Sequence, residues 1–251
     1  SPFIERIRKL ERELEALKKT MEENKNTSKI TRDFIIVHLI FVGVCVAILT
    51  IPIPFGMGIK LFILVICYNL LIFVIGFFRK YNGWLRQWYF VLVISLFQIF
   101  PDWFLSAQLG VLIFPEDGLF KIGPVSGYMA GLWVIPLFLI CFIGSKVKDH
   151  SSHAKGLVVV GLMSLFIFVI AEQTMWMLQS WYPQNVTLLF DHLAVYIVIP
   201  EVILGLSTFY CYNKTKSQHI LILIVVAFGI MLLYLGNASF FYLIFEKIIF
   251  I

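Results

Sequence analysis

The sequence predicts an all-α polytopic membrane protein, in which seven transmembrane helices follow a cytoplasmic amphipathic, coiled-coil-like helix. Two observations predict this class. Hydrophobic residues make up 60% of the 251 residues, whereas charged residues make up 14%. Apolar runs of about 20 residues, the length that crosses roughly 30 Å of hydrocarbon, recur along the chain. They lie at residues 34–55, 57–78, 88–114, 127–144, 156–178, 188–212 and 219–245.

The first element is a charged helix. We divide the chain into a coiled-coil-like helix over residues 1–29 and a seven-helix transmembrane domain over residues 30–251. Apolar residues three and four positions apart form the seam of a coiled coil. These are Phe3, Ile7, Leu10, Leu14, Leu17 and Met21. We expect residues 24–28 to form a hinge before the first span.

Charges beside this seam favour self-association. Arg6 and Glu11, like Glu13 and Lys18, occupy the g and e positions that face each other in a parallel pair, and their signs are opposite. The sequence therefore predicts a possible homodimer through residues 3–21. The alternative is a single amphipathic helix that lies on the membrane surface or against the protein.

Basic residues set the predicted orientation. The segments that precede spans one, three, five and seven carry Arg32, Arg79, Lys80, Arg86, Lys146, Lys148, Lys155, Lys214 and Lys216. The alternate segments carry only Lys60, Lys121 and Lys247. Because short cytoplasmic loops are enriched in Lys and Arg, we expect the N-terminus in the cytoplasm and the C-terminus outside. Anionic lipid at the cytoplasmic face accounts for the net charge of +5, so no nucleic-acid partner is expected.

Cysteine and histidine do not indicate a cofactor or a metal site. The cysteines lie in predicted spans without metal-ligand spacing and are interpreted as small core residues: Cys45, Cys67, Cys141 and Cys211. His150 and His153 share a short loop, where we expect them to be solvated rather than to bind a metal ion.

Isolated carboxylates are the strongest indication of a functional site. Residues 156–213 contain Glu172, Asp191 and Glu201 but no Lys or Arg, and Asp102 lies in the third span. A charged side chain at the bilayer centre costs about 2.5–3.5 kcal/mol, so such residues are usually paired or functional. We expect Glu172 and Glu201 to act at one site, with at least one acid protonated at neutral pH.

Other polar and aromatic residues are expected near these acids. Gln98, Asp102 and Ser106 repeat every four residues, and Pro101 predicts a kink beside Asp102. Asp191 and His192 are expected at the start of span six, with Asp191 and Glu201 lining one cavity. The predicted substrate-binding residues are Tyr128, Trp133, Trp176, Asp191, His192 and Asn237, with Tyr234 at a comparable depth. The alternative is that these groups only form hydrogen bonds between helices.

One short motif resembles a known enzyme class. Pro200-Glu201 inside a seven-span bundle resembles membrane lycopene and terpene cyclases, in which intramembrane acids protonate a polyene or an epoxide. The resemblance covers two residues and the topology, and this chain lacks a second Glu after the proline. It implies acid catalysis on an isoprenoid.

The acids and an aromatic content of 16% lead to one functional hypothesis. The chain is expected to be a membrane enzyme of the cyclase, hydratase or isomerase type, acting on an isoprenoid- or lipid-like substrate. Glu172 and Glu201 would be acid and base, with Asp102 as a third carboxylate. The alternatives are a proton-coupled or cation-binding transporter or receptor, and a non-catalytic assembly factor.

Overall fold

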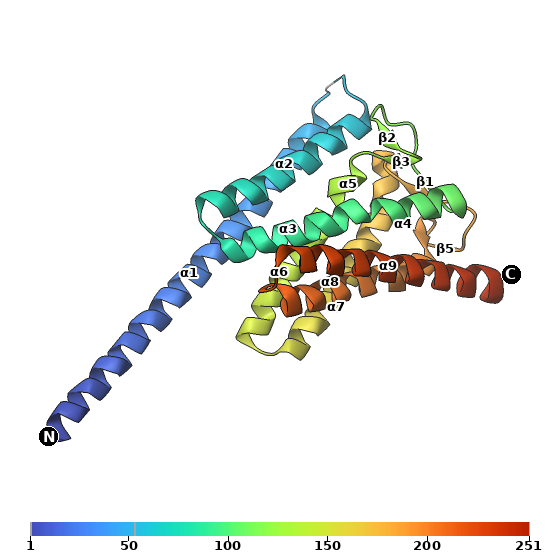
Figure 1. Ribbon diagram of the computed structural model, residues 1–251. Coiled ribbons are helices and arrows are strands. Elements are labelled where there is room, and N and C mark those ends of the chain that lie inside the picture. Colours follow the sequence, from blue (N-terminus) through green and yellow to red (C-terminus); the bar gives the residue numbers. More distant parts are fainter. Residues whose placement is uncertain (1, 53, 251) are drawn as a thin grey trace. The chain divides into compact units, whose positions relative to one another are not determined.

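The computed structural model describes residues 2–52 and 54–250, and its chain is almost entirely helical (Figure 1). Within these residues, seven helices are long and apolar enough to cross a membrane. The prediction of an all-α, multi-pass membrane protein is therefore confirmed. Residues up to Ala47 form one compact unit, and the chain from Ile48 forms a second.

The first unit belongs to a single helix, α1 (Pro2–Thr50), which includes the charged N-terminal segment and the first span and ends three residues into the second unit. The predicted hinge at residues 24–28 is wrong, because helical structure continues through it. This stretch contains neither Gly nor Pro, and each of its polar residues costs a helix interior no more than about 0.7 kcal/mol. Extending a helix that has already formed on both sides offsets that cost. The helix ends just before Pro52, which disfavours helical geometry in the residue before it.

The second unit contains six further spans, several of which combine helices of different types. They are α2 (Met57–Phe78); α3 (Asn82–Phe97), α4 (Ile99–Trp103) and the π-helix η1 (Phe104–Gln108); α5 (Met129–Leu132) and α6 (Val134–His150); α7 (His153–Thr174) and the 3₁₀-helix η2 (Met175–Leu178); the 3₁₀-helix η3 (Val195–Ile197) and α8 (Val198–Thr215); and α9 (Ile220–Ile244) with the π-helix η4 (Phe245–Ile249). The predicted span 57–78 agrees with α2. Span six begins at Val195 instead of residue 188.

Connections at the two ends of this bundle differ. At one end, which we call the turn end, short turns join α2 to α3, α6 to α7 and α8 to α9. At the other, the hairpin end, longer segments carry three antiparallel strand pairs. These are β1 (Leu112–Ile113) with β4 (Tyr182–Pro183), β2 (Lys121–Ile122) with β3 (Val125–Ser126), and β5 (Leu188–Leu189) with β6 (Leu193–Ala194).

Aromatic packing forms the core of the turn end. Phe138 of α6 and Phe209 of α8 are fully buried there. The hydroxyl of Tyr212 donates to the carbonyl oxygen of Gly83 at 2.9 Å, which ties α8 to the start of α3. Gly144 allows α6, α7 and α8 to approach closely, because a Cβ atom at this position would collide with the side chain of Val160. Small residues permit this kind of close contact between membrane helices.

Candidate functional site

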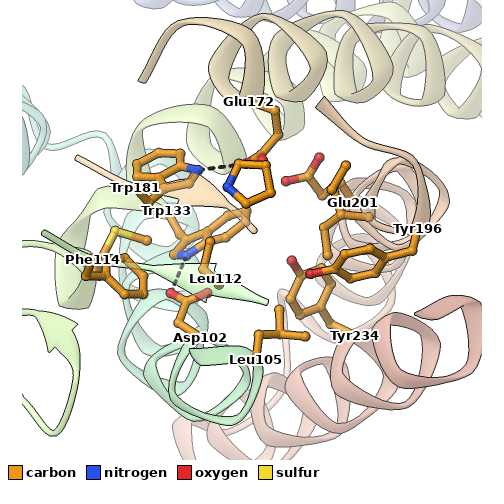
Figure 2. Close-up of a pocket in the computed structure, with 14 residues that line it drawn as sticks. Asp102, Leu105, Leu112, Phe114, Trp133, Glu172, Trp181, Tyr196, Glu201 and Tyr234 are labelled. Atoms are coloured by element: carbon orange, nitrogen blue, oxygen red, sulfur yellow. Dashed lines mark hydrogen bonds between the residues drawn. The ribbon is translucent and has the colours of Figure 1, made fainter. Parts of the chain in front are cut away.

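A small cavity lies inside the hairpin end of the bundle, where α4, α7, α8 and α9 meet. Its volume is about 30 Å³, which is room for roughly two water molecules. Figure 2 shows the carboxyl groups of Asp102 and Glu201 and the hydroxyl groups of Tyr196 and Tyr234 directed toward it. The lining residues are Asp102, Leu105, Leu112, Phe114, Met129, Trp133, Glu172, Trp181, Pro183, Ala194, Tyr196, Ile197, Glu201 and Tyr234. None of these described residues is basic.

The three acids have different hydrogen-bond environments. Glu172 Oε1 accepts a hydrogen bond from the indole nitrogen of Trp181 at 2.8 Å. Asp102 Oδ2 accepts a long one from the indole nitrogen of Trp133 at 3.5 Å. Glu201 is 3% exposed, and among the described residues no group donates to its Oε2. None of the ion pairs seen in residues 2–52 and 54–250 includes these acids.

Prolines interrupt or begin the helices that carry the cavity. Pro101 has no N–H to donate to the residue four positions earlier, and α3 ends at Phe97 before α4 begins. The kink expected beside Asp102 stays a prediction. Pro136 follows the break between α5 and α6, at which Trp133 lies. Pro200 lies in the first turn of α8, where its missing N–H costs little, and directly precedes Glu201.

The predicted polar stripe on the third span is incomplete. Gln98 is fully buried and Asp102 lines the cavity, but Ser106 does not. Ser106 lies in the π-helix η1 and is only half-buried. Leu105 lines the cavity instead.

The strand pair β1–β4 closes the cavity at the hairpin end. Leu112 of β1 pairs with Pro183 of β4, and both residues line the cavity. Gln184 strengthens the pairing, because its backbone N–H donates to Val111 O at 2.9 Å and its side-chain amide donates to Gly110 O at 3.0 Å. Two connecting segments that are far apart in sequence therefore form a single cover, which also contains Trp181.

Four residues predicted for the site line the cavity together, namely Asp102, Glu172, Glu201 and Trp133. Tyr128 is buried next to this group but does not line the cavity. Its hydroxyl instead contacts the hydroxyl oxygen of Ser180 at 2.7 Å.

Four other predicted residues lie elsewhere. Trp176 and His192 stack on each other, with ring centroids 4.1 Å apart, and line a separate groove at the hairpin end. Asp191 is exposed in the turn between β5 and β6, where its φ of 68° is typical of tight hairpins. Its predicted position on a helix with Glu201 is therefore wrong, as is that of His192. Asn237 donates to Leu233 O of its own helix at 2.8 Å.

Sequence reasoning missed the apolar lining residues and also two amphipathic aromatic ones, Trp181 and Tyr196. Trp181 and Tyr196 lie in the segment between α7 and α8, which contains hairpin β5–β6 and no regular periodicity. A pattern argument places residues on helix faces, so it does not predict which side chains of an irregular segment turn inward. The one available signal is that both are amphipathic aromatic residues, which need a polar partner when buried.

Comparison with protein families gives one match. The family described as "Domain of unknown function (DUF6989)" matches residues 99–245, more than half of the chain. The chain belongs to the DUF6989 family. The matched region begins at α4 and extends to η4, so it includes all three acids of the cavity. No curated protein and no solved structure matches the chain.

Proposed function

We propose that this DUF6989 protein is an integral membrane enzyme that acts by acid catalysis on an apolar isoprenoid- or lipid-like substrate. The single observation that carries the proposal is the cavity itself, where three carboxyl groups meet under aromatic rings with no basic side chain in the lining. Burial without a cationic partner favours the neutral form of at least one carboxyl. A neutral carboxylic acid in a dry site can donate its proton to a substrate.

The hydrogen bonds of Glu201 and Glu172 suggest which of them is the acid and which is the base. Glu201 receives no hydrogen bond at Oε2, so we assign it the proton that is donated. Its place in the first turn of α8 favours the anion by only about 0.3–1 kcal/mol, which is less than the cost of an unpaired buried charge. Glu172 accepts the indole N–H of Trp181, which stabilises a carboxylate, and we assign it the role of base.

The proposed reaction is balanced without a further reactant. Glu201 protonates one carbon of a double bond, and the new C–H bond leaves a carbocation on the neighbouring carbon. Attack by a second double bond of the same molecule closes a ring. Glu172 then removes a proton from an adjacent carbon, so the net change is a cyclisation or an isomerisation. Water in the cavity returns the proton from Glu172 to Glu201. If that water attacked the carbocation instead, the product would be hydrated.

Aromatic rings around the acids support a cationic intermediate. The indole of Trp133 lines the cavity and packs against the rings of Phe168 and Tyr234, with centroids 5.6 and 5.9 Å away. The faces of Trp and Tyr attract cations by about 0.5–2 kcal/mol, and by more where water is excluded. Asp102 lies on the same side as Trp133 and would contribute a third carboxyl close to the developing charge.

Deuterium incorporation tests this proposal. The protein is reconstituted in vesicles in D₂O with acyclic isoprenoids, from geraniol to squalene, which are recovered and analysed by mass spectrometry. We expect deuterium in at least one isoprenoid, because Glu201 exchanges its proton for deuterium in D₂O and transfers it to a carbon of the substrate. Glu201→Gln should reduce incorporation at least about 100-fold. Incorporation that is equal in the parent and in Glu201→Gln would reject the mechanism.

A proton-coupled transporter is the second candidate, and a different observation favours it. Gln98 is fully buried, and neither its amide oxygen nor its amide nitrogen has a partner in the part of the chain that the structure describes. The same holds for Ser95 Oγ and Thr208 Oγ1. Unpaired buried polar groups cost about 1–3 kcal/mol each, so water beside them is expected and would extend from the cavity toward the turn end. Proton entry into vesicles loaded with a pH-sensitive dye, abolished by Gln98→Leu, would favour this candidate.

We also propose that the N-terminus and the turn end face the cytoplasm and that the C-terminus lies outside. The support is the basic residues beside the turns of this end, including Arg79, Lys148 and Lys214. A membrane-impermeant thiol reagent applied to intact cells should label Glu116→Cys in the hairpin end but not Ser151→Cys in the turn end. The reverse pattern would overturn the orientation.

Self-association through residues 3–21 is a further proposal. The seam residues Phe3, Leu10, Leu17 and Met21 are all more than half exposed on α1. The occupant we propose is a second copy of the same helix, because the g and e positions carry charges that complement each other in a parallel pair.

A further inference from the structure

A second, larger hollow adjoins the acid cavity. It is an open groove between α6 and α7 with a volume of about 270 Å³. Its walls consist almost entirely of apolar side chains, contributed mainly by α5 and α6 on one side and by α7 on the other. The lining residues are Met129, Leu132, Trp133, Ile135, Pro136, Leu139, Ile167, Phe168, Ala171, Glu172, Met175, Trp181 and Glu201.

The groove is continuous with the cavity. Met129, Trp133, Glu172, Trp181 and Glu201 line both hollows. The two glutamates are therefore the polar end of an otherwise apolar groove. Both helices that form its sides cross the membrane, so hydrocarbon is the medium that surrounds its opening.

The difference in volume limits where a substrate can bind. The acid cavity, at about 30 Å³, holds roughly two waters and no organic molecule. The groove is about nine times larger, as the ratio of 270 to 30 Å³ shows. The bulk of any organic substrate must therefore lie in the groove, with only its reacting group at the glutamates.

We propose that the groove between α6 and α7 binds the hydrocarbon chain of the substrate, which enters from the lipid with its reacting end toward Glu172 and Glu201. This inference rests on the proposed function and specifies its substrate: a prenyl-type chain dissolved in the bilayer. Apolar binding sites that fix a ligand through a few polar groups have this construction. Among the side chains that line the groove, only the indoles of Trp133 and Trp181 offer a hydrogen bond before the glutamates.

Ala171 is the position from which the groove can be blocked. It lies one residue before Glu172 on α7, and its small side chain leaves the groove open. Tryptophan at this position would fill the space beside the glutamates without adding a charge. Ile170 is the matched control, because it is the adjacent residue, is exposed and does not line the groove.

Photolabelling tests the inference with a readout other than turnover. Farnesol that carries a diazirine at its hydrocarbon end is added to the full chain in vesicles and irradiated, and the labelled residues are mapped by mass spectrometry. We expect labelling concentrated in the groove segments 132–139 and 167–175, and displaced by unlabelled farnesol but not by hexadecane. Ala171→Trp should reduce this labelling at least about tenfold, whereas Ile170→Trp should leave it unchanged.

The outcomes separate this inference from the proposed function. Groove labelling that is blocked by Ala171→Trp, together with no deuterium incorporation, would support binding of the chain in the groove and reject acid catalysis. The opposite result is deuterium incorporation that depends on Glu201, with labelling that is spread evenly over lipid-facing residues or is insensitive to Ala171→Trp. It would support acid catalysis and overturn binding of the chain in the groove. Binding that is retained in Glu201→Gln is expected, because the groove holds the chain without the acid.

Discussion

The turn end and the hairpin end of the bundle contain segments of the same spans but differ in regularity. At the turn end, α3, α6 and α8 are uninterrupted, and the buried side-chain amide of Gln87 donates to the carbonyl oxygen of Phe138 at 2.9 Å. At the hairpin end, the same spans break or change helix type near Pro101, Pro136 and Pro200. Irregular backbone at membrane depth is tolerated where it lines a cavity. The turn end therefore packs regular helices closely, whereas the hairpin end accommodates three carboxyl groups beside irregular backbone.

The largest expected effect is a loss of stability caused by a change at the turn end. Gly144→Leu would drive a side chain into Val160 and Phe209, and overpacking of this kind costs about 3 kcal/mol. We expect a clear decrease in the free energy of unfolding, measured by circular dichroism in increasing concentrations of SDS. Gly229→Leu is the control, because no atom lies within 4 Å of the Cβ it would add. Equal stability of both variants would show that the turn end is not tightly packed.

At the hairpin end, substitution of the acids should remove function while leaving the fold intact. We expect an infrared carboxyl band above roughly 1,700 cm⁻¹ at neutral pH, because a buried acid without a cation favours the protonated form. The band should weaken as the pH rises and disappear in Glu201→Gln, while Glu172→Gln should alter it without unfolding the protein. If the parent shows no such band at pH 7, the acids are ionised and hydrated, and the comparison between a stable end and a reactive end fails.

A smaller effect on activity is expected from loss of the Trp181 indole, which donates to Glu172. Trp181→Phe removes one hydrogen bond to a carboxylate, worth about 1.5–3 kcal/mol, and should reduce deuterium incorporation roughly tenfold or more. Trp176→Phe serves as the matched control, because this indole donates to Gln173 O outside the cavity. If the two variants lose activity equally, the hairpin end acts through general packing rather than through the bond to Glu172.

Substitutions in the seam of α1 should have the smallest effect on the packing and the carboxyl groups of the bundle. Replacing Leu10 and Leu17 with Asp should convert a detergent-solubilised dimer to a species of half the mass by light scattering, with the infrared band unchanged. Arg12→Asp with Lys19→Asp changes charge at positions away from the seam and should preserve the dimer. A mass that does not respond to the seam variant would show that residues 3–21 do not mediate association.

Periodicity and hydropathy predicted the spans and the three acids that line the cavity, because a charge in an apolar run is visible without coordinates. The same reasoning failed for Asp191, where a hairpin with positive φ replaces the expected first turn of a helix. It also failed for Ser106, which does not line the cavity although it lies four residues after Asp102. Both failures lie at the hairpin end, where local geometry depends on pairing between distant segments, such as Leu112 with Pro183.

The cover formed by β1 and β4 determines the phase, membrane or water, in which the substrate concentration should be defined. The proposed function, with β1 and β4 covering the hairpin end and the groove between α6 and α7 open to lipid, requires substrate and product to exchange with the bilayer rather than with water. Occupancy of the groove would then depend on the mole fraction of the isoprenoid in the membrane, so dilution with lipid should lower the rate, whereas dilution with buffer should not.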